Sequence, residues 1–266
     1  MKASSDAAAR ANLPDPEYGP VFGLLTPQAN TTVEPEMQLL LRGTLLTARC
    51  TSASADSRQR LLDYLDNLRA TLVQFDSAPL RVAGFACTGS AYLVGRARED
   101  EQLAVLGRQL TFPVISATQA IRRCLDQIGA RRIALLSPYP AWLSSAAQDY
   151  WRGAGYTITA VAGLSEDLAD TRGIYGLHTS RVQHMLATLD TRDCDALLLS
   201  GTGMPTLRSI AALPDTRPVL SSNLCLAWAM QQTVSTHACG AHSLRAFIGP
   251  DAVWRQRLRD LQEHAA

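Results

Sequence analysis

Short apolar runs alternate with amphipathic stretches along most of the chain. Eight of these runs are rich in Val, Ile and Leu and have the length of strands. The strands are expected at 21–25, 44–48, 81–86 and 112–116, and again at 131–136, 156–162, 195–200 and 217–221. Helices are expected between the strands, for example at 56–75, 118–128, 179–189 and 223–233. This alternation predicts an α/β fold in which parallel sheets are flanked by helices.

The first four strands and the last four carry similar short sequences in the same order. LLTP at 24–27 returns as LLSP at 135–138, FACTG at 85–89 as LSGTG at 199–203, and PVIS at 113–116 as PVLS at 218–221. From Leu24 to Leu135, from Cys87 to Gly201 and from Pro113 to Pro218 the shifts are 111, 114 and 105 positions. A nearly constant shift indicates an internal duplication. We therefore expect two pseudo-symmetric halves, each a flavodoxin-like parallel sheet flanked by helices.

The duplication also suggests boundaries for the two halves. Residues 20–117 are expected to form the first half and residues 118–234 the second. Residues 1–19 contain no apolar run and are expected to be a flexible lead. A C-terminal helix within 235–266 is expected to pack back on the first half.

The segments that follow the strands are expected to form a cleft between the halves. Open parallel sheets bind ligands beyond the carboxyl ends of their strands, which is where each repeated sequence ends. A pseudo-twofold relation places Cys87 and Gly201 on opposite sides of this cleft. Val33, Leu46 and Met204 are expected to shape its walls.

Cys87 stands between an expected strand and the start of a helix. The free N–H groups of a first helical turn lower the pKa of a thiol, so we expect Cys87 to be a nucleophile or an acid of lowered pKa. The turn after it and the matching turn of the second half offer donors for one carboxylate each. The residues of the two turns are Thr88, Gly89 and Ser90, and Gly201, Thr202 and Gly203. Two such sites beside one thiol predict a small dicarboxylate substrate.

Four segments resemble a known family. The sequences GLLTPQANTTVEPE at 23–36, ACTGSAYLVG at 86–95, SPY at 137–139 and SGTGMP at 200–205 are similar to the maleate isomerase and arylmalonate decarboxylase branch of the aspartate/glutamate racemase superfamily. The similarity extends over most of the chain. It implies an active site between two α/β halves, and catalysis without a metal or an organic cofactor.

The resemblance also implies roles for single residues. Cys87 matches the isomerase cysteine that adds to the double bond of maleate. Asn30 matches an asparagine that binds one substrate carboxylate, and Tyr139 matches a tyrosine that contacts the other end of the substrate. Thr88 and Ser90 fall where the family holds a carboxylate with backbone and hydroxyl donors.

One position departs from the family pattern. Maleate isomerases and two-base racemases carry a second cysteine in the second-half turn, where this chain has Gly201. Arylmalonate decarboxylase also pairs one cysteine with one glycine, but with the sides exchanged. Two mechanisms therefore stay open: isomerisation of a maleate-like diacid with Cys87 as nucleophile, and decarboxylation of an arylmalonate-type acid with Cys87 as stereospecific proton donor. An amino-acid racemase and a non-catalytic diacid-binding protein are further alternatives.

Composition argues against several other functions. Lys2 is the only lysine among the 266 residues, so the chain has no core amine for a Schiff base and no GxxxxGK phosphate loop. A net charge of +1 provides no broad basic surface for nucleic acid or an anionic membrane. No stretch reaches the roughly 18 apolar residues of a membrane span, and we expect a cytoplasmic enzyme.

The six cysteines are scattered and are expected to be reduced thiols. A zinc site is not expected, because the spacing of its possible ligands is irregular. Those ligands are Cys225, His237, Cys239 and His242. A homodimer is suggested by the family resemblance alone.

Overall fold

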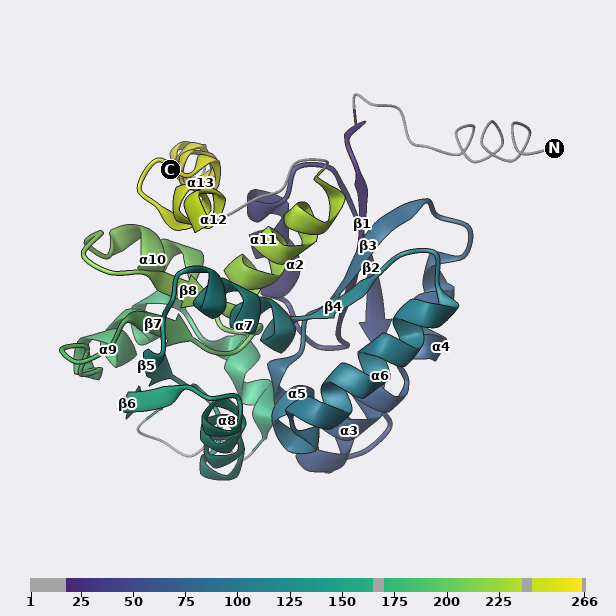
Figure 1. Cartoon of the computed structure of the whole chain (residues 1–266), viewed down its shortest axis with the longest axis horizontal. Helices are drawn as coiled ribbons and strands as arrows, with labels where there is room; N and C mark the ends of the chain where they lie inside the picture. The colour runs from purple at the N-terminus through teal and green to yellow at the C-terminus, as the bar shows by residue number, and fades with distance from the viewer. Residues whose placement is uncertain (1–17, 165–169, 236–240, 265–266) are drawn as a thin grey trace.

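A computed structural model describes residues 18–164, 170–235 and 241–264 (Figure 1). Its strands form two separate four-stranded sheets in which every pairing is parallel. The first sheet, in the order β2-β1-β3-β4, contains β1 (Val21–Pro27), β2 (Thr44–Cys50), β3 (Leu80–Phe85) and β4 (Val114–Ser116). The second, in the order β6-β5-β7-β8, contains β5 (Arg132–Leu136), β6 (Thr157–Ala162), β7 (Ala196–Leu199) and β8 (Val219–Ser221).

The two sheets repeat the same topology, which confirms the predicted pair of α/β halves. In register, Leu24 of β1 pairs with Thr47 and Gly84, and Leu135 of β5 pairs with Val161 and Leu198. Every residue of β1 is buried, as expected for a central parallel strand covered on both faces. All the predicted strands are present, with their bounds shifted by a few residues at most.

Helices cover the sheets and connect their strands. In the first part of the chain they are α2 (Val33–Leu40), α3 (Ser57–Asp66), α4 (Leu68–Leu72), the 3-10 helix η2 (Val73–Phe75), α5 (Thr88–Val94), α6 (Arg96–Gln109) and α7 (Ala117–Gln127). The rest are α8 (Ala141–Gly153), the 3-10 helix η3 (Thr171–Gly176), α9 (Thr179–Thr188), α10 (Leu207–Ala212), α11 (Ser222–Val234), α12 (Ala241–Ile248) and α13 (Val253–Glu263). The single helix predicted at 56–75 is wrong in detail: Asn67 leaves helical geometry (φ −92°, ψ 9°) and divides it.

Two equivalent helices, α7 and α11, join the halves (Figure 1). Each follows the last strand of its sheet and begins at a serine cap: Ser116 accepts from the N–H of Gln119, and Ser221 from that of Leu224. Helices α7 and α11 pack against each other, and α11 also packs against β3. At that contact a Cβ on Gly84 would lie 2.5 Å from Sδ of Met230, so only glycine fits without displacement.

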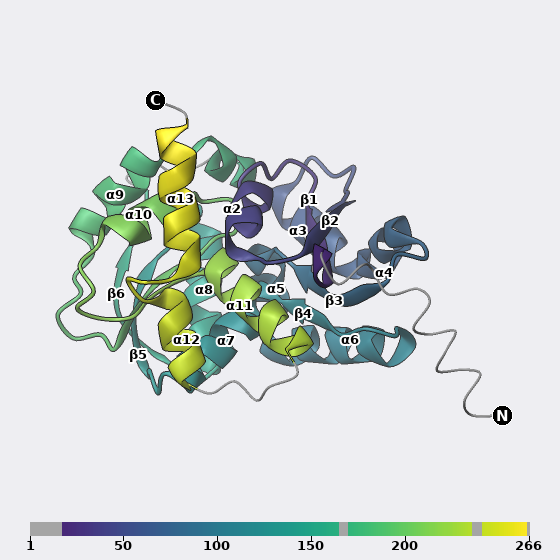
Figure 2. The ribbon, with the colours of Figure 1, turned by 90° about the horizontal axis from the view of Figure 1, so that it is seen from above.

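The C-terminal helices contact both parts of the chain. Helix α12 packs against α7 and α11, while α13 packs against α2 (Figure 2). Arg257 donates to the carbonyls of Leu39 and Leu41, and Arg255 donates to that of Ala211. The predicted boundaries of the halves stay a prediction, and the expected lead falls almost wholly outside the described residues. Within the described ranges no helix is long and apolar enough to cross a bilayer.

Candidate active site

A small cavity of about 20 Å³ lies where β3 ends and α5 begins, between the two halves of the chain. Five of the nine predicted site residues line it, namely Cys87, Thr88, Gly89, Tyr139 and Thr202. Nine residues that were not predicted complete the wall: Pro27, Arg60, Leu61, Tyr64, Leu143, Thr171, Arg172, Ile174 and Tyr175. Because both halves contribute, the turn that carries Cys87 faces the second half.

Cys87 is the N-cap residue of α5 and its side chain is buried. Its Sγ lies 3.2 Å from Oγ of Ser90, and that Oγ donates its hydrogen to the carbonyl of Leu61 at 2.6 Å. With the serine proton committed, the thiol is the donor in the Cys87–Ser90 contact. The surroundings therefore favour the protonated sulfur.

The prediction that Cys87 has a lowered pKa is wrong. Burial raises the pKa of the Cys87 thiol above its usual value, and this effect outweighs the backbone N–H groups of Ser90 and Gly89, which act in the opposite direction. The free energy needed to remove a thiolate from water is larger here than the stabilisation that the first turn of α5 provides. The helix terminus was recognised correctly, but sequence alone could not show how deeply the sulfur is buried.

Hydroxyl groups from both halves meet around the cavity. The hydroxyls of Thr88 and Tyr139 lie 2.7 Å apart, and Thr202 Oγ1 donates to the carbonyl of Ala86 at 2.8 Å. Burial raises the pKa of Tyr139 well above its usual value and that of Tyr64 to about 12. Both phenols are therefore neutral hydrogen-bond donors at neutral pH.

Asn30 is fully buried behind the cavity wall rather than in it. Its Oδ1 accepts from the N–H groups of Thr32 and Val33, and its Nδ2 donates to Thr202 Oγ1 at 3.3 Å. These bonds fix the loop after β1 and hold the Thr202 turn against it. Direct binding of a carboxylate by Asn30 stays a prediction.

The glycines of the second-half turn fit closely packed positions. Gly201 has φ +122°, a region that L side chains rarely adopt, and a Cβ there would lie 3.3 Å from Oη of Tyr139. Its N–H donates to Oγ of Ser222 at 3.0 Å. A Cβ on Gly203 would lie 2.5 Å from ring atoms of Tyr175. A cysteine at position 201 would therefore strain the backbone and crowd Tyr139.

The residues expected to shape the pocket do not line it. Val33 and Met204 are fully buried, and Leu46 is a partly buried residue packed on the hydrophobic core. Val33 and Met204 belong to the hydrophobic core and Leu46 packs against it, so all three serve core packing rather than the cavity wall. That expectation was wrong.

The two charged residues of the described cavity wall, Arg60 and Arg172, were missed. They come from the segments that follow β2 and β6, which are equivalent strands in the duplicated topology. That equivalence was the available signal, because both segments begin at the carboxyl end of the second strand of their half. Asp170 forms ion pairs with both arginines.

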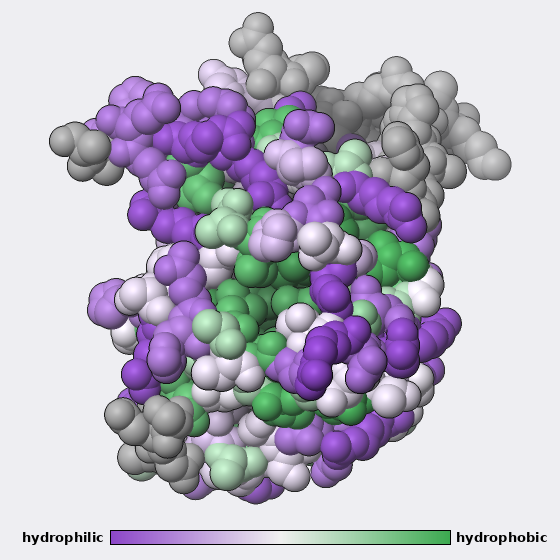
Figure 3. Space-filling model, turned by 90° about the vertical axis from the view of Figure 1, so that its left-hand side faces the viewer, coloured by the Kyte–Doolittle hydropathy of each residue, from purple (hydrophilic) through white to green (hydrophobic). Residues whose placement is uncertain are grey.

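A wider, largely apolar hollow of about 370 Å³ lies between α9 and α10 (Figure 3). Its walls include Leu186, Leu189, Leu213 and Val219, and it shares no residue with the Cys87 cavity. Within the described ranges no three His, Cys, Asp or Glu side chains are grouped as metal ligands would be. Of the suggested zinc ligands Cys225 is a buried free thiol, and the other three side chains lie outside the described residues.

Residues 22–246 match the family model described as arylmalonate decarboxylase. A maleate isomerase from Nocardia farcinica (strain IFM 10152) is 30% identical over 200 residues, which cover 67% of this chain and 74% of the relative.

Two solved structures are similar to the fold. The maleate isomerase Iso from Pseudomonas putida S16 has a TM-score of 0.74 and 22% identity, with 81% of this chain and 92% of that chain covered. An arylmalonate decarboxylase structure has a TM-score of 0.70 and 16% identity, with 83% and 95% covered. The chain belongs to the arylmalonate decarboxylase family and is an enzyme of the isomerase or decarboxylase kind.

Proposed function

We propose that this enzyme is a maleate-like cis-trans isomerase of a small dicarboxylate, with Cys87 as the nucleophile. The observation that supports this most is the position of the Cys87 thiol, at the N-terminus of α5 and in the wall of a cavity built by both halves. The similarity to a maleate isomerase supports the choice of reaction.

In the proposed reaction the sulfur adds to one carbon of the cis double bond. The C–S bond forms while the π electrons move to the neighbouring carbon and its carboxylate, which takes the charge as an enediolate. The remaining single bond rotates, the electrons return, and the C–S bond breaks to release the trans diacid and the thiolate. No atom is gained or lost, and the sulfur is regenerated.

Donors around the cavity suit the charge that develops in this step. The backbone N–H groups of Gly89 and Ser90 are directed toward the position of the Cys87 sulfur, and Thr88 and Tyr139, whose hydroxyls bond to each other, line the same cavity. Preorganised donors of this kind stabilise an enediolate more effectively than water does. Arg60 and Arg172 add positive charge for a doubly negative substrate.

The raised pKa of Cys87 fits this mechanism if the cavity admits water before the chemistry. Burial is the largest cause of the raised pKa, so hydration of the sulfur lowers the pKa and increases the thiolate fraction. The nucleophile would then form in an open state of the site. In the closed cavity the sulfur is held as a thiol.

The second candidate is a decarboxylase of arylmalonate type. A protonated Cys87 and glycine at position 201 both favour it, because a thiol facing one side of an enediolate delivers its proton stereospecifically. A racemase is less well supported, since Gly201 leaves the opposite face without a thiol. A homodimer and a cytoplasmic location stay predictions.

Proton NMR with a panel of diacids tests the proposal. Maleate converted to fumarate supports the isomerase, and phenylmalonate converted to phenylacetate supports the decarboxylase. Solvent deuterium entering both enantiomers of aspartate or glutamate would indicate a racemase. A diacid that protects Cys87 from alkylation but is not converted would indicate a binding protein. Cys87→Ala should abolish turnover.

Cys50→Ala is the matched control for the Cys87 variant. Cys50 is a buried free thiol that lies near enough to Cys87 to interact with it electrostatically, yet it does not line the cavity. Burial raises the pKa of Cys50 to about 12, so it is neutral in the reaction. Turnover that survives in Cys87→Ala, or is lost equally in both variants, would rule out Cys87 as the catalytic residue.

A further inference from the structure

The cavity beside Cys87 is too small for the proposed substrate. Its volume of about 20 Å³ suits one water molecule. A dicarboxylate with a four-carbon chain occupies several times that space. The described arrangement is therefore a closed one, and part of the wall has to move before any diacid reaches the sulfur.

The 3-10 helix η3 supplies the largest single piece of the second-half wall. Thr171, Arg172, Ile174 and Tyr175 all line the cavity, and all four lie within this one short element. A 3-10 helix of this length has weaker internal hydrogen bonding than an α-helix, so its position depends on outside contacts. Those contacts decide whether the wall stays closed.

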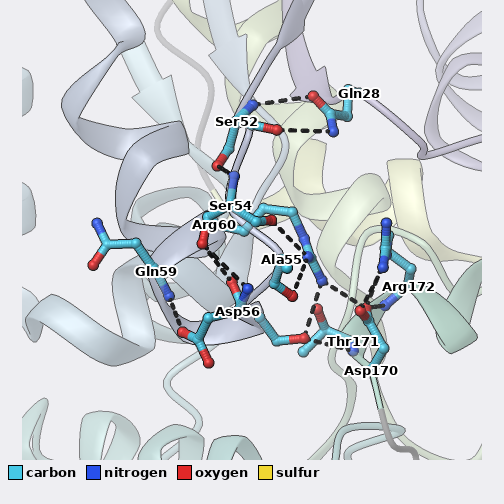
Figure 4. A network of polar contacts seen from close by, with 11 residues as sticks. Gln28, Ser52, Ser54, Ala55, Asp56, Gln59, Arg60, Asp170, Thr171 and Arg172 are labelled. Carbon is cyan, nitrogen blue, oxygen red and sulfur yellow. Dashed lines mark hydrogen bonds and ion pairs between the residues drawn. The ribbon is translucent and has the colours of Figure 1, made fainter.

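Asp170, the N-cap residue of η3, ties this wall to the first half (Figure 4). Its Oδ1 accepts from Nη2 of Arg60 at 2.6 Å, across 110 positions of sequence. The Arg60 side chain is only 2% exposed, and its other hydrogen bonds go to the carbonyls of Ser54 and Ala55 and the hydroxyl of Ser57. Arg60 is thus fixed within the first half, and the pair bridges the halves at the rim of the cavity.

We propose that Asp170 is a positioning residue whose ion pair with Arg60 latches the Thr171–Gly176 wall over Cys87, and that release of this latch admits the substrate. Charge-assisted hydrogen bonds to a buried guanidinium are strong enough to set such a position. Arg172 also binds Asp170 through Nη2 at 2.8 Å, which leaves one uncompensated positive charge near the entrance for an approaching dianion. The identity of the substrate rests on the proposed function, whereas the latch does not.

The chain contains a matched control for Asp170. The sequence Asp-Thr-Arg occurs at 170–172 and again at 190–192. In both copies the arginine side chain donates to the aspartate through Nε and Nη2, and its backbone N–H donates to the same carboxylate. Among the described ion pairs Asp190 has Arg192 as its partner, while Asp170 has Arg60 in addition.

The experiment measures how well the closed wall excludes thiol reagents of different size. The full-length protein is treated with methyl methanethiosulfonate and with the bulkier N-ethylmaleimide, and mass spectrometry follows the peptide that contains Cys87. We expect Asp170→Asn to raise the rate with N-ethylmaleimide about tenfold, equivalent to about 1.4 kcal/mol. The smaller reagent should gain less, and Asp190→Asn should match the wild type with both.

The ratio of the two rates separates access from reactivity, because a changed pKa of Cys87 would alter both reactions alike. An unchanged ratio in a folded Asp170→Asn variant overturns the latch, as does an equal change in Asp190→Asn. If Asp170→Asn fails to fold, Arg60→Lys replaces it, and the same ratio of the two labelling rates is measured for that variant. If the ratio responds but the wild type converts none of the diacids, the latch stands and the proposed function fails.

Discussion

Replacing Gly203 with alanine should push the η3 wall outward. A Cβ at this position would lie 2.5 Å from Cδ1 and Cε1 of Tyr175 and 2.9 Å from Cδ1 of Ile174. Carbon atoms in contact normally lie about 3.5–4.0 Å apart, so the Tyr175 ring has to retreat by about 1 Å. Both residues belong to η3 and line the Cys87 cavity, so the displacement loosens the wall.

The cost of this change can be worked out from the same contacts. Overpacking of a buried site costs about 1–3 kcal/mol. Gly203 is not among the residues of positive φ, so backbone strain adds nothing, and the loss of unfolded-state freedom returns about 0.4–1 kcal/mol. We therefore expect Gly203→Ala to lower the free energy of unfolding by about 1–2 kcal/mol.

Gly176→Ala is the control, because Gly176 lies in η3, has no atom within 4 Å of its Cβ position and has no positive φ. It should leave stability unchanged or slightly increased. Urea denaturation measures the free energy of unfolding of both variants, and N-ethylmaleimide measures access to Cys87. Equal stability and equal Cys87 labelling in the two variants would refute the close contact between Gly203 and the wall.

Reaction of Cys87 with iodoacetamide should be slower at pH 7 than that of free cysteine and should keep rising above pH 9, because burial raises its pKa; an apparent pKa below about 8.5 contradicts this. Burial also raises the pKa of Glu36, so its contribution to stability is complete below the usual 4.5 and is lost as the pH rises through the folded-state value. The free energy of unfolding, measured by urea titration from pH 4 to 8, should fall by up to about 1.4 kcal/mol per pH unit because of this group. Glu36→Gln should remove that dependence, whereas Glu34→Gln should retain it. Gly201→Cys should lower the free energy of unfolding by about 1–3 kcal/mol without raising turnover, because φ at this position is +122° and Tyr139 is close. A gain of activity at unchanged stability would contradict this prediction.

The sheets were predictable because their signals are local and repeated. The buried strand β1 appears in the sequence as an apolar run, and its counterpart β5 repeats both the run and the Ser or Thr after the two leucines. The position of Cys87 at a strand-to-helix junction was equally visible, since it needs only the order of neighbouring elements. Both features are set within about ten residues of chain.

Features that depend on distant contacts could not be predicted in this way. Arg60 and Asp170 are separated by 110 positions, and no local sequence pattern relates the two. The pKa of Cys87 was predicted in the wrong direction because the favourable helix terminus is local, while the burial that outweighs it comes from side chains of both halves. Duplication could have directed attention to the segments after β2 and β6, but it could not have shown that they pair.

Closure and ionisation are physically linked in this site. In the closed arrangement the Cys87 sulfur is desolvated and donates to Ser90, so it is held as a weakly nucleophilic thiol. Opening of the η3 wall would admit water together with the dicarboxylate, and hydration lowers the thiol pKa because burial is its main perturbation. One movement would therefore supply both the space for the substrate and the charge on the nucleophile. A variant that loosens the latch should accordingly show a lower apparent pKa of Cys87 as well as faster labelling, whereas a latch that controls access alone would change the labelling rate and leave the pKa where it was.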